Sequence, residues 1–99
     1  MRNRLANRRR CDTFELNCRG LRYICSVGYF PDGDIAEIFL SNHKAASAAD
    51  VAARDAAIAA SLALQHGATI ESIRAALCRE QDGSASGPLG MALDILRED

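Results

Sequence analysis

His43 and Lys44 are neighbouring residues whose side chains can take part in acid–base or anion-binding chemistry. They lie where a strand-type segment gives way to an alanine-rich one, so we expect them in a loop before a helix. There histidine could exchange a proton, and Lys44 could bind phosphate together with free N–H groups of the helix. Because no Ser-His-Asp spacing, phosphate loop or dinucleotide glycine pattern accompanies the pair, we predict no catalytic residue and keep Lys44 as a candidate phosphate contact.

Four cysteines, at positions 11, 18, 25 and 78, are the other candidates for chemistry. They contain no C-x-x-C pair, and their seven-residue spacing matches no zinc pattern. We therefore expect reduced, partly buried thiols, no disulfide framework, no metal and no cofactor. Cys18 and Cys25 fall on the face of the predicted sheet that should be buried, so no two cysteines form an obvious redox pair.

Arginine is concentrated at the start of the chain. Residues 1–22 hold seven arginines against Asp12 and Glu15, a net charge of +5, while residues 23–99 carry −6. A basic arm over residues 1–10 could bind a phosphate backbone or an acidic partner, or it could be a solvated tail. The candidate nucleic-acid contacts in this arm are Arg2, Arg4, Arg8, Arg9 and Arg10.

Strand-type residues run on both sides of the turn signal Pro31–Asp34, and they predict a β-hairpin over Gly20–Asn42. If the four turn residues form the loop, Phe30 pairs with Ile35, and Val27 and Cys25 pair with Ile38 and Leu40. One apolar face then consists of Cys25, Val27, Tyr29, Ala36, Ile38 and Leu40.

Alternating residues before the hairpin predict a further strand. Phe14, Leu16 and Cys18 alternate with polar residues, and Arg19-Gly20 is short enough for a tight turn that pairs Leu16 with Tyr23. These residues join the apolar face, giving a three-stranded antiparallel meander from about Asp12 to Leu40.

The chain after the meander is helical. Ser47 and Asp50 form a capping pattern for a long helix that ends near Gly67, and Thr69 caps a second helix to about Arg79. We expect the long helix to cover the sheet with the row Val51, Asp55, Ile58, Leu62 and Gln65. A last helix begins at Pro88 and is apolar enough to dock, either in this chain or on a second copy.

Length and composition indicate one small domain. The sequence predicts a basic arm (1–10), an α+β domain (11–80), a polar linker (81–87) and a C-terminal helix (88–99). The predicted fold is a three-stranded antiparallel β-meander with a long and a shorter helix packed on one face, plus the C-terminal helix. No apolar stretch is long enough to cross a membrane, so we expect a cytoplasmic protein with no membrane partner.

Several short features in this order resemble the TSCPD domain, found toward the C-terminus of cobalamin-dependent (class II) ribonucleotide reductases and as small free-standing proteins. The features are the D-G turn after a glycine-led strand, Glu37-Ile38-Phe39, Lys44-Ala45, a helix that ends Ser61-Leu62-Ala63-Leu64, and the G-x-x-x-E step from Gly67 to Glu71. They cover about Asp12 to Leu77, roughly two thirds of the chain. The T-S-C-P-D string and the cysteine-rich tail of the full-length enzymes do not occur.

The resemblance implies a module linked to deoxyribonucleotide and DNA synthesis, with a reductase large subunit as a possible partner. Ribonucleoside-diphosphate reduction itself needs a large barrel and redox cysteines that this sequence does not show, so we expect a non-catalytic binding or assembly module. Nucleic-acid binding through the basic arm is the alternative. We also predict a homodimer, because four large apolar residues should point away from the helices and the last helix could cross to a second copy. The candidate interface residues are Ile24, Phe30, Ile35, Phe39, Leu89, Leu93 and Leu96.

Overall fold

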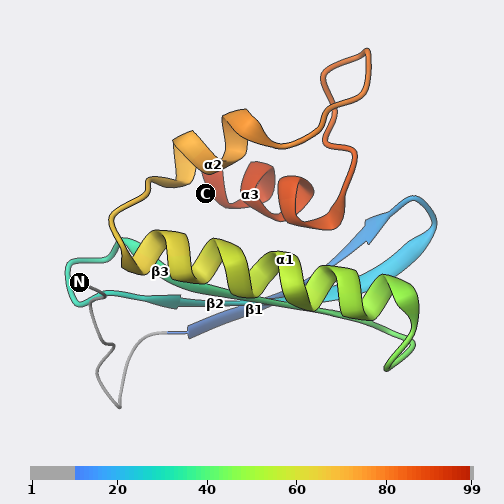
Figure 1. Cartoon of the computed structure of the whole chain (residues 1–99), viewed down its shortest axis with the longest axis horizontal. Helices are drawn as coiled ribbons and strands as arrows, with labels where there is room; N and C mark the ends of the chain where they lie inside the picture. Colours follow the sequence, from blue (N-terminus) through green and yellow to red (C-terminus); the bar gives the residue numbers. More distant parts are fainter. Residues whose placement is uncertain (1–10, 99) are drawn as a thin grey trace.

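The computed structural model describes residues 11–98 and shows three strands followed by three helices. An antiparallel sheet with the order β1-β2-β3 is formed by β1 (Cys11–Cys18), β2 (Leu21–Tyr29) and β3 (Ile35–Asn42). The helices are α1 (Ala48–Gln65), α2 (Ile70–Ala76) and α3 (Pro88–Glu98). This arrangement confirms the predicted α+β class and the order of the elements (Figure 1).

The hairpin of β1 and β2 has the predicted register, with Cys18 opposite Leu21 and Leu16 opposite Tyr23. Its two-residue loop places Arg19 and Gly20 at φ angles of 52° and 79°. Positive φ at both loop residues matches the right-handed twist of the strands, which is why so short a loop can close this hairpin.

The hairpin of β2 and β3 differs from the prediction near its turn. Val27 pairs with Ile38 as expected, but Ile35 pairs with Tyr29 instead of Phe30, because a β-bulge interrupts the ladder at Gly28 and Tyr29. An extra residue in one strand reverses the side on which the following side chains lie. Ile35 therefore packs against the core instead of pointing away from the helices. Phe30 is half-buried and lines a hollow together with Ile35 on the helix side of this turn.

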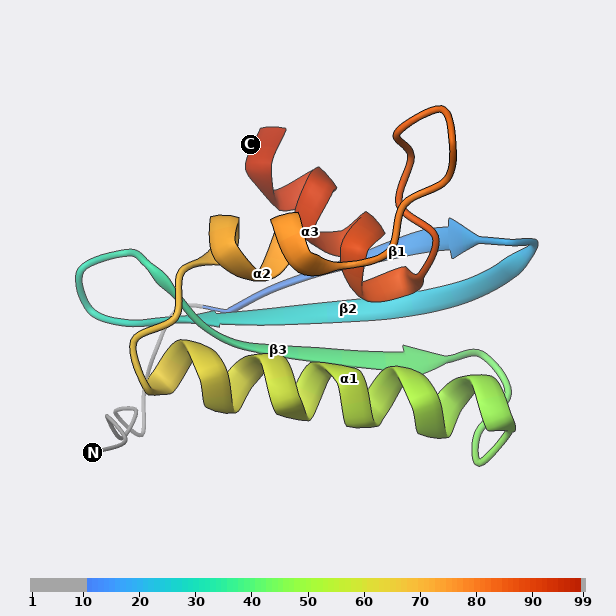
Figure 2. The same ribbon diagram turned by 45° about the horizontal axis from the view of Figure 1, so that its top comes forward.

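The core lies between one face of the sheet and the helices. Residues from all three strands, α1 and α3 are buried there: Leu16, Cys18, Tyr23, Cys25, Val27, Tyr29, Ile38, Leu40, Ala53, Ala57, Ala60, Leu64, Leu89, Ala92 and Leu93. Figures 1 and 2 show α1 running along β3, with α2 and α3 beside it. The strand residues predicted for the apolar face are thus the ones that the helices cover.

The face of α1 that meets the sheet differs from the predicted one, and of the large apolar residues and Gln65 in the predicted row only Gln65 is buried, at 3 % exposed. Val51, Ile58 and Leu62 are 50 %, 54 % and 41 % exposed, whereas the buried apolar side chains on this helix are Ala53, Ala57, Ala60 and Leu64. Alanine lets a helix approach a strand closely, so the smaller side chains occupy the contact and the larger ones face out. The start of α1 is as predicted, since the Ser47 hydroxyl accepts from the N–H of Asp50.

The last helix docks within its own chain. Leu89 and Leu93 are 7 % and 0 % exposed, and Leu96 packs against the same core. The preceding segment forms a tight loop, with a bridge between Arg79 and Ala85. The helix α2 has the predicted Thr69 cap but ends at Ala76, before the expected Arg79.

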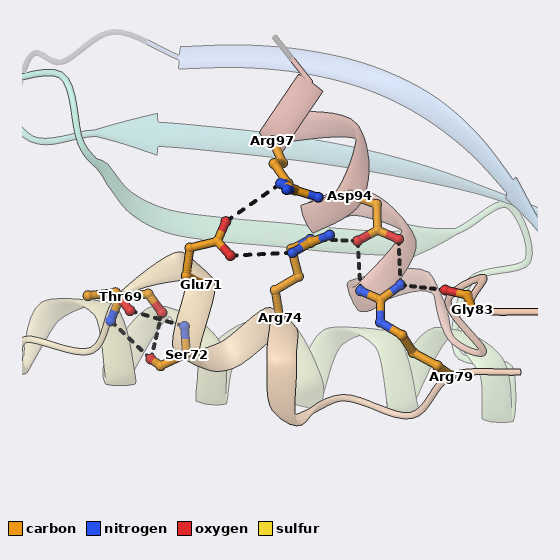
Figure 3. Close-up of polar contacts among 8 residues, drawn as sticks. All are labelled: Thr69, Glu71, Ser72, Arg74, Arg79, Gly83, Asp94 and Arg97. Carbon is orange, nitrogen blue, oxygen red and sulfur yellow. Dashed lines mark hydrogen bonds and ion pairs between the residues drawn. The ribbon is translucent and has the colours of Figure 1, made fainter.

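A cluster of charged side chains fastens α3 to α2 and to the loop after it (Figure 3). The two terminal nitrogens of Arg79 donate to the two carboxylate oxygens of Asp94 at 2.9 and 2.8 Å, and Arg74 Nε donates at 2.7 Å. Bonds from Arg79, followed by those from Arg74, lower the pKa of Asp94 to about 2, against the opposing effect of burial. The carboxylate therefore stays ionised and holds two arginines in place.

Candidate interaction surface

The helix α1 lies against the outer edge of β3 and bonds backbone groups that an edge strand leaves open. Ser61 Oγ accepts the N–H of Ile38 at 2.8 Å and donates to the carbonyl of the same residue at 3.0 Å. Gln65 Nε2 donates to the carbonyl of Ala36 at 3.2 Å. These side chains close an edge that could otherwise pair with a strand of another molecule.

Asp50 closes the far end of the same edge. Its carboxylate accepts the N–H of Asn42 at 2.9 Å and the N–H of Ala46 at 3.0 Å, and Arg54 Nε donates to it at 3.0 Å. The bonds from Asn42 and Ala46, and then the contact with Arg54, hold the pKa of Asp50 below its usual value. A negative charge is thus fixed beside the N-terminus of α1, where Lys44 was expected to help bind phosphate.

Between these capped positions, the outward backbone groups of Leu40 have no side-chain partner among the described residues, although Leu40 is only 3 % exposed. Alternate residues of an antiparallel strand present their N–H and C=O groups to the same side, so Leu40 shares the outer edge with Ile38 and Asn42. Its two groups bond to no side chain of the described residues. Ala57, whose methyl group cannot form hydrogen bonds, and Leu40 both line a hollow of about 390 Å³ at this edge.

Large apolar side chains surround this hollow. Ile24 and Phe39 come from the uncovered face of the sheet and are 45 % and 53 % exposed, and Ile58 of α1 completes the rim. We call Ile24, Phe39 and Ile58 the apolar surface. Val51 and Leu62 lie on the same stripe of α1 as Ile58, so exposed apolar side chains continue along the helix. These large apolar side chains therefore lie together on the surface and are not scattered singly.

Other predicted interface residues lie elsewhere. Phe30 and Ile35 are at the hairpin end, and Leu89, Leu93 and Leu96 pack in the core of their own chain. Ile58 was missed because its row was expected to face the sheet. One stripe of this alanine-rich helix carries three polar residues, Asp50, Ser61 and Gln65. Polar side chains can bond to the backbone of a strand edge, so this stripe was a usable sign of the side of the helix that meets the strand.

The residues considered for catalysis do not converge. His43 Nδ1 lies 3.2 Å from the carbonyl oxygen of Arg22, and the exposed Lys44 contributes only its backbone, donating to Asn42 Oδ1 at 3.0 Å. Neither residue lines the hollow beside Phe30, the hollow beside Leu40 or the hollow beside Tyr23. The arginines at positions 2, 4, 8, 9 and 10 lie outside the described residues.

All four cysteines are free thiols, as predicted. Cys25 is fully buried and burial raises its pKa to about 12, while burial also raises the pKa of Cys18. A thiol with a raised pKa is a poor nucleophile, so these two cysteines are structural. Cys11 and Cys78 are exposed. None of the helices within residues 11–98 is both long and apolar enough to cross a membrane.

Comparison with curated proteins finds one distant similarity. The chain is 39 % identical over 70 residues to a vitamin B12-dependent ribonucleotide reductase of Agrobacterium fabrum. The match covers 71 % of this chain but only 6 % of that enzyme. No protein-family model and no solved structure matches the chain.

Proposed function

We propose that this protein is a non-catalytic assembly module that associates with a second copy through the apolar surface. The observation that carries the proposal is the juxtaposition of Ile24, Phe39 and Ile58 around a hollow where the backbone of Leu40 has no side-chain cap. Apolar side chains supply the driving force for association, because burying them removes apolar area from water.

A second copy is the occupant that this surface favours. In a two-fold dimer the same patch faces itself, so an apolar patch needs no separate complementary surface. Among residues 11–98, the one charged side chain that lines the hollow is Arg54, which is bonded to Asp50 at 3.0 Å, and this leaves little unpaired charge to desolvate. Apolar interfaces with few charges are typical of homodimers.

A link to ribonucleotide reduction is the wider context of the proposal. It is supported by the similarity to a vitamin B12-dependent ribonucleotide reductase and by the TSCPD-like features of the sequence. The match covers 6 % of that enzyme, so the proposed link concerns a shared segment and not the activity of the whole enzyme. A pull-down with the tagged chain tests this link: failure to retain the reductase large subunit at any salt concentration removes it.

Self-association is tested by sedimentation on the parent chain and on two matched variants. About half of the Phe39 surface is exposed, on the order of 100 Å² of a phenylalanine's 150–250 Å². Burying it contributes about 2.5 kcal/mol per copy, so Phe39→Ser should raise the dimer dissociation constant by at least roughly a hundredfold. Leu21→Ser is the control, because Leu21 is exposed but does not line the hollow. A monomeric parent chain refutes the dimer.

Nucleic-acid binding is a second candidate, and the observation that favours it is the net charge of +5 over residues 1–22. Fluorescence anisotropy with labelled DNA and RNA at low salt is the test. Binding should disappear when residues 1–10 are deleted. Absence of binding, or binding unchanged by the deletion, rules this candidate out.

A further inference from the structure

A third hollow, of about 300 Å³, lies on the opposite side of α1 from its exposed stripe, between α1 and the start of α3. One wall carries alanines of α1, including Ala52 and Ala56, and the other carries Leu77 and Pro88. Tyr23 of β2 contributes to the lining from the sheet. The hollow exists because alanines stand where larger side chains would fill the space, and its lining is mainly apolar with few polar groups, as in many small-molecule sites.

The N-terminus of α3 opens into this hollow without a cap. Gly87 precedes the helix and has no side chain to accept a bond, and Pro88 has no N–H. The N–H groups of Leu89 and Gly90 find no acceptor within residues 11–98, although both residues are buried and line the hollow. The first turn holds no acidic residue, so nothing neutralises the positive end of the helix dipole.

The hydroxyl of Tyr23 is an independent sign of a ligand. Tyr23 is only 5 % exposed, yet its hydroxyl bonds to none of the described residues. Every side-chain oxygen or nitrogen that is sealed from solvent in the described chain has a hydrogen-bond partner. The Tyr23 hydroxyl is therefore not sealed from solvent, and Tyr23 is one of the residues that line the hollow. A tyrosine buried to this degree usually bonds through its hydroxyl.

From these three features we infer that the hollow binds a small monocarboxylic acid with an apolar body. The carboxylate would accept from the N–H groups of Leu89 and Gly90 and from the Tyr23 hydroxyl, at the positive end of α3. The apolar body would lie against the alanine wall of α1. A neutral ligand would leave the dipole uncompensated, and the described residues that line the hollow include no charged side chain that could repel or pair with the anion.

The test is a titration of the full 99-residue chain with hexanoate, followed by the backbone amide signals of Leu89 and Gly90 in NMR spectra. Both signals should shift and saturate, with a dissociation constant on the order of 1 mM for a ligand of this size. Acetate, which lacks the apolar body, and 1-hexanol, which lacks the charge, should bind at least roughly tenfold more weakly. No saturable shift with hexanoate, or equal binding of hexanol, overturns the proposal.

Two variants separate binding from folding. Tyr23→Phe removes a hydroxyl that has no protein partner, so it should leave the melting temperature unchanged and weaken hexanoate binding roughly tenfold. Ala52→Leu should fill the hollow and abolish binding. Ala59→Leu is its matched control, because Ala59 is two turns away on the same helix face, is also exposed and does not line the hollow. Equal binding by Ala52→Leu and Ala59→Leu would place the ligand elsewhere.

Discussion

Replacing Asp94 by asparagine tests how firmly α3 is held in its own chain. The pKa of Asp94 falls from an ordinary value of 3.8 to about 2, chiefly through the bonds from Arg79 and also through Arg74. A shift of this size corresponds to about 2 kcal/mol of stability. Because the carboxylate side chain is 30 % exposed, solvent screening reduces the effect to between about 1 and 2 kcal/mol. Asp94→Asn should lower the melting temperature by roughly 4 to 15 °C.

The sign of the pH dependence follows from the lowered pKa. The stabilisation by Asp94 is fully present above the pKa of the unfolded chain, near 3.8, and is lost as the pH falls through about 2. The difference in unfolding free energy between parent and Asp94→Asn should therefore be constant from about pH 7 to pH 5 and vanish near pH 2. Urea denaturation followed by circular dichroism at each pH measures this difference.

Glu71 offers a control within the same cluster (Figure 3). Its side chain is 67 % exposed and lies 3.3 Å from Arg74 and 3.9 Å from Arg97. Exposed pairs contribute little, so Glu71→Gln should change stability only slightly. If Asp94→Asn and the parent lose stability in parallel between about pH 5 and pH 2, the arginine cluster does not hold α3 as argued.

Three further predictions follow from the packing of α1 on β3. Ile38→Asp should unfold the chain, because the Ile38 side chain is 0 % exposed and a carboxylate there would be buried. Ile58→Asp should leave the fold intact, because Ile58 is 54 % exposed. Thermal melts of both variants, followed by circular dichroism, decide the orientation of α1. Ser61→Ala should cost about 1 to 3 kcal/mol by leaving the N–H and C=O of Ile38 unpaired, and an unchanged urea midpoint would contradict the capping role. Alkylation at mildly alkaline pH should label Cys78 rapidly and Cys25 only after denaturation; rapid labelling of both in the native chain would contradict the buried position of Cys25.

The sheet was predictable because the sequence pattern of its strands separates the residues of the buried face from most of those of the open face. In β1 and β2 apolar and polar residues alternate, and Arg19-Gly20 allows only a short turn, so the register of Leu16 with Tyr23 could be derived. The bulge in β3 could not be derived, since Ile35 and Ala36 are both apolar and neither marks where an extra residue is inserted. That one residue moved Ile35 from the expected open face to the core.

The face of α1 was predicted wrongly because two of its stripes are apolar. The row with Val51, Ile58 and Leu62 is larger and was chosen on hydrophobicity, but the row of small alanines allows the closer approach to β3. Ile58 is the residue that α1 contributes to the apolar surface, so this part of the surface could be found only with the correct face of α1. The sheet half, Ile24 and Phe39, was predictable from strand parity alone.

The central claim is association through the apolar surface, and intermolecular nuclear Overhauser effects test it most directly. A mixed sample combines one copy labelled with ¹³C and ¹⁵N and one unlabelled copy, and an isotope-filtered experiment detects only contacts between copies. The account predicts contacts from the Phe39 ring to the methyl groups of Ile24 and Ile58 on the other copy. The absence of intermolecular contacts, or their restriction to residues outside the apolar surface, would contradict it.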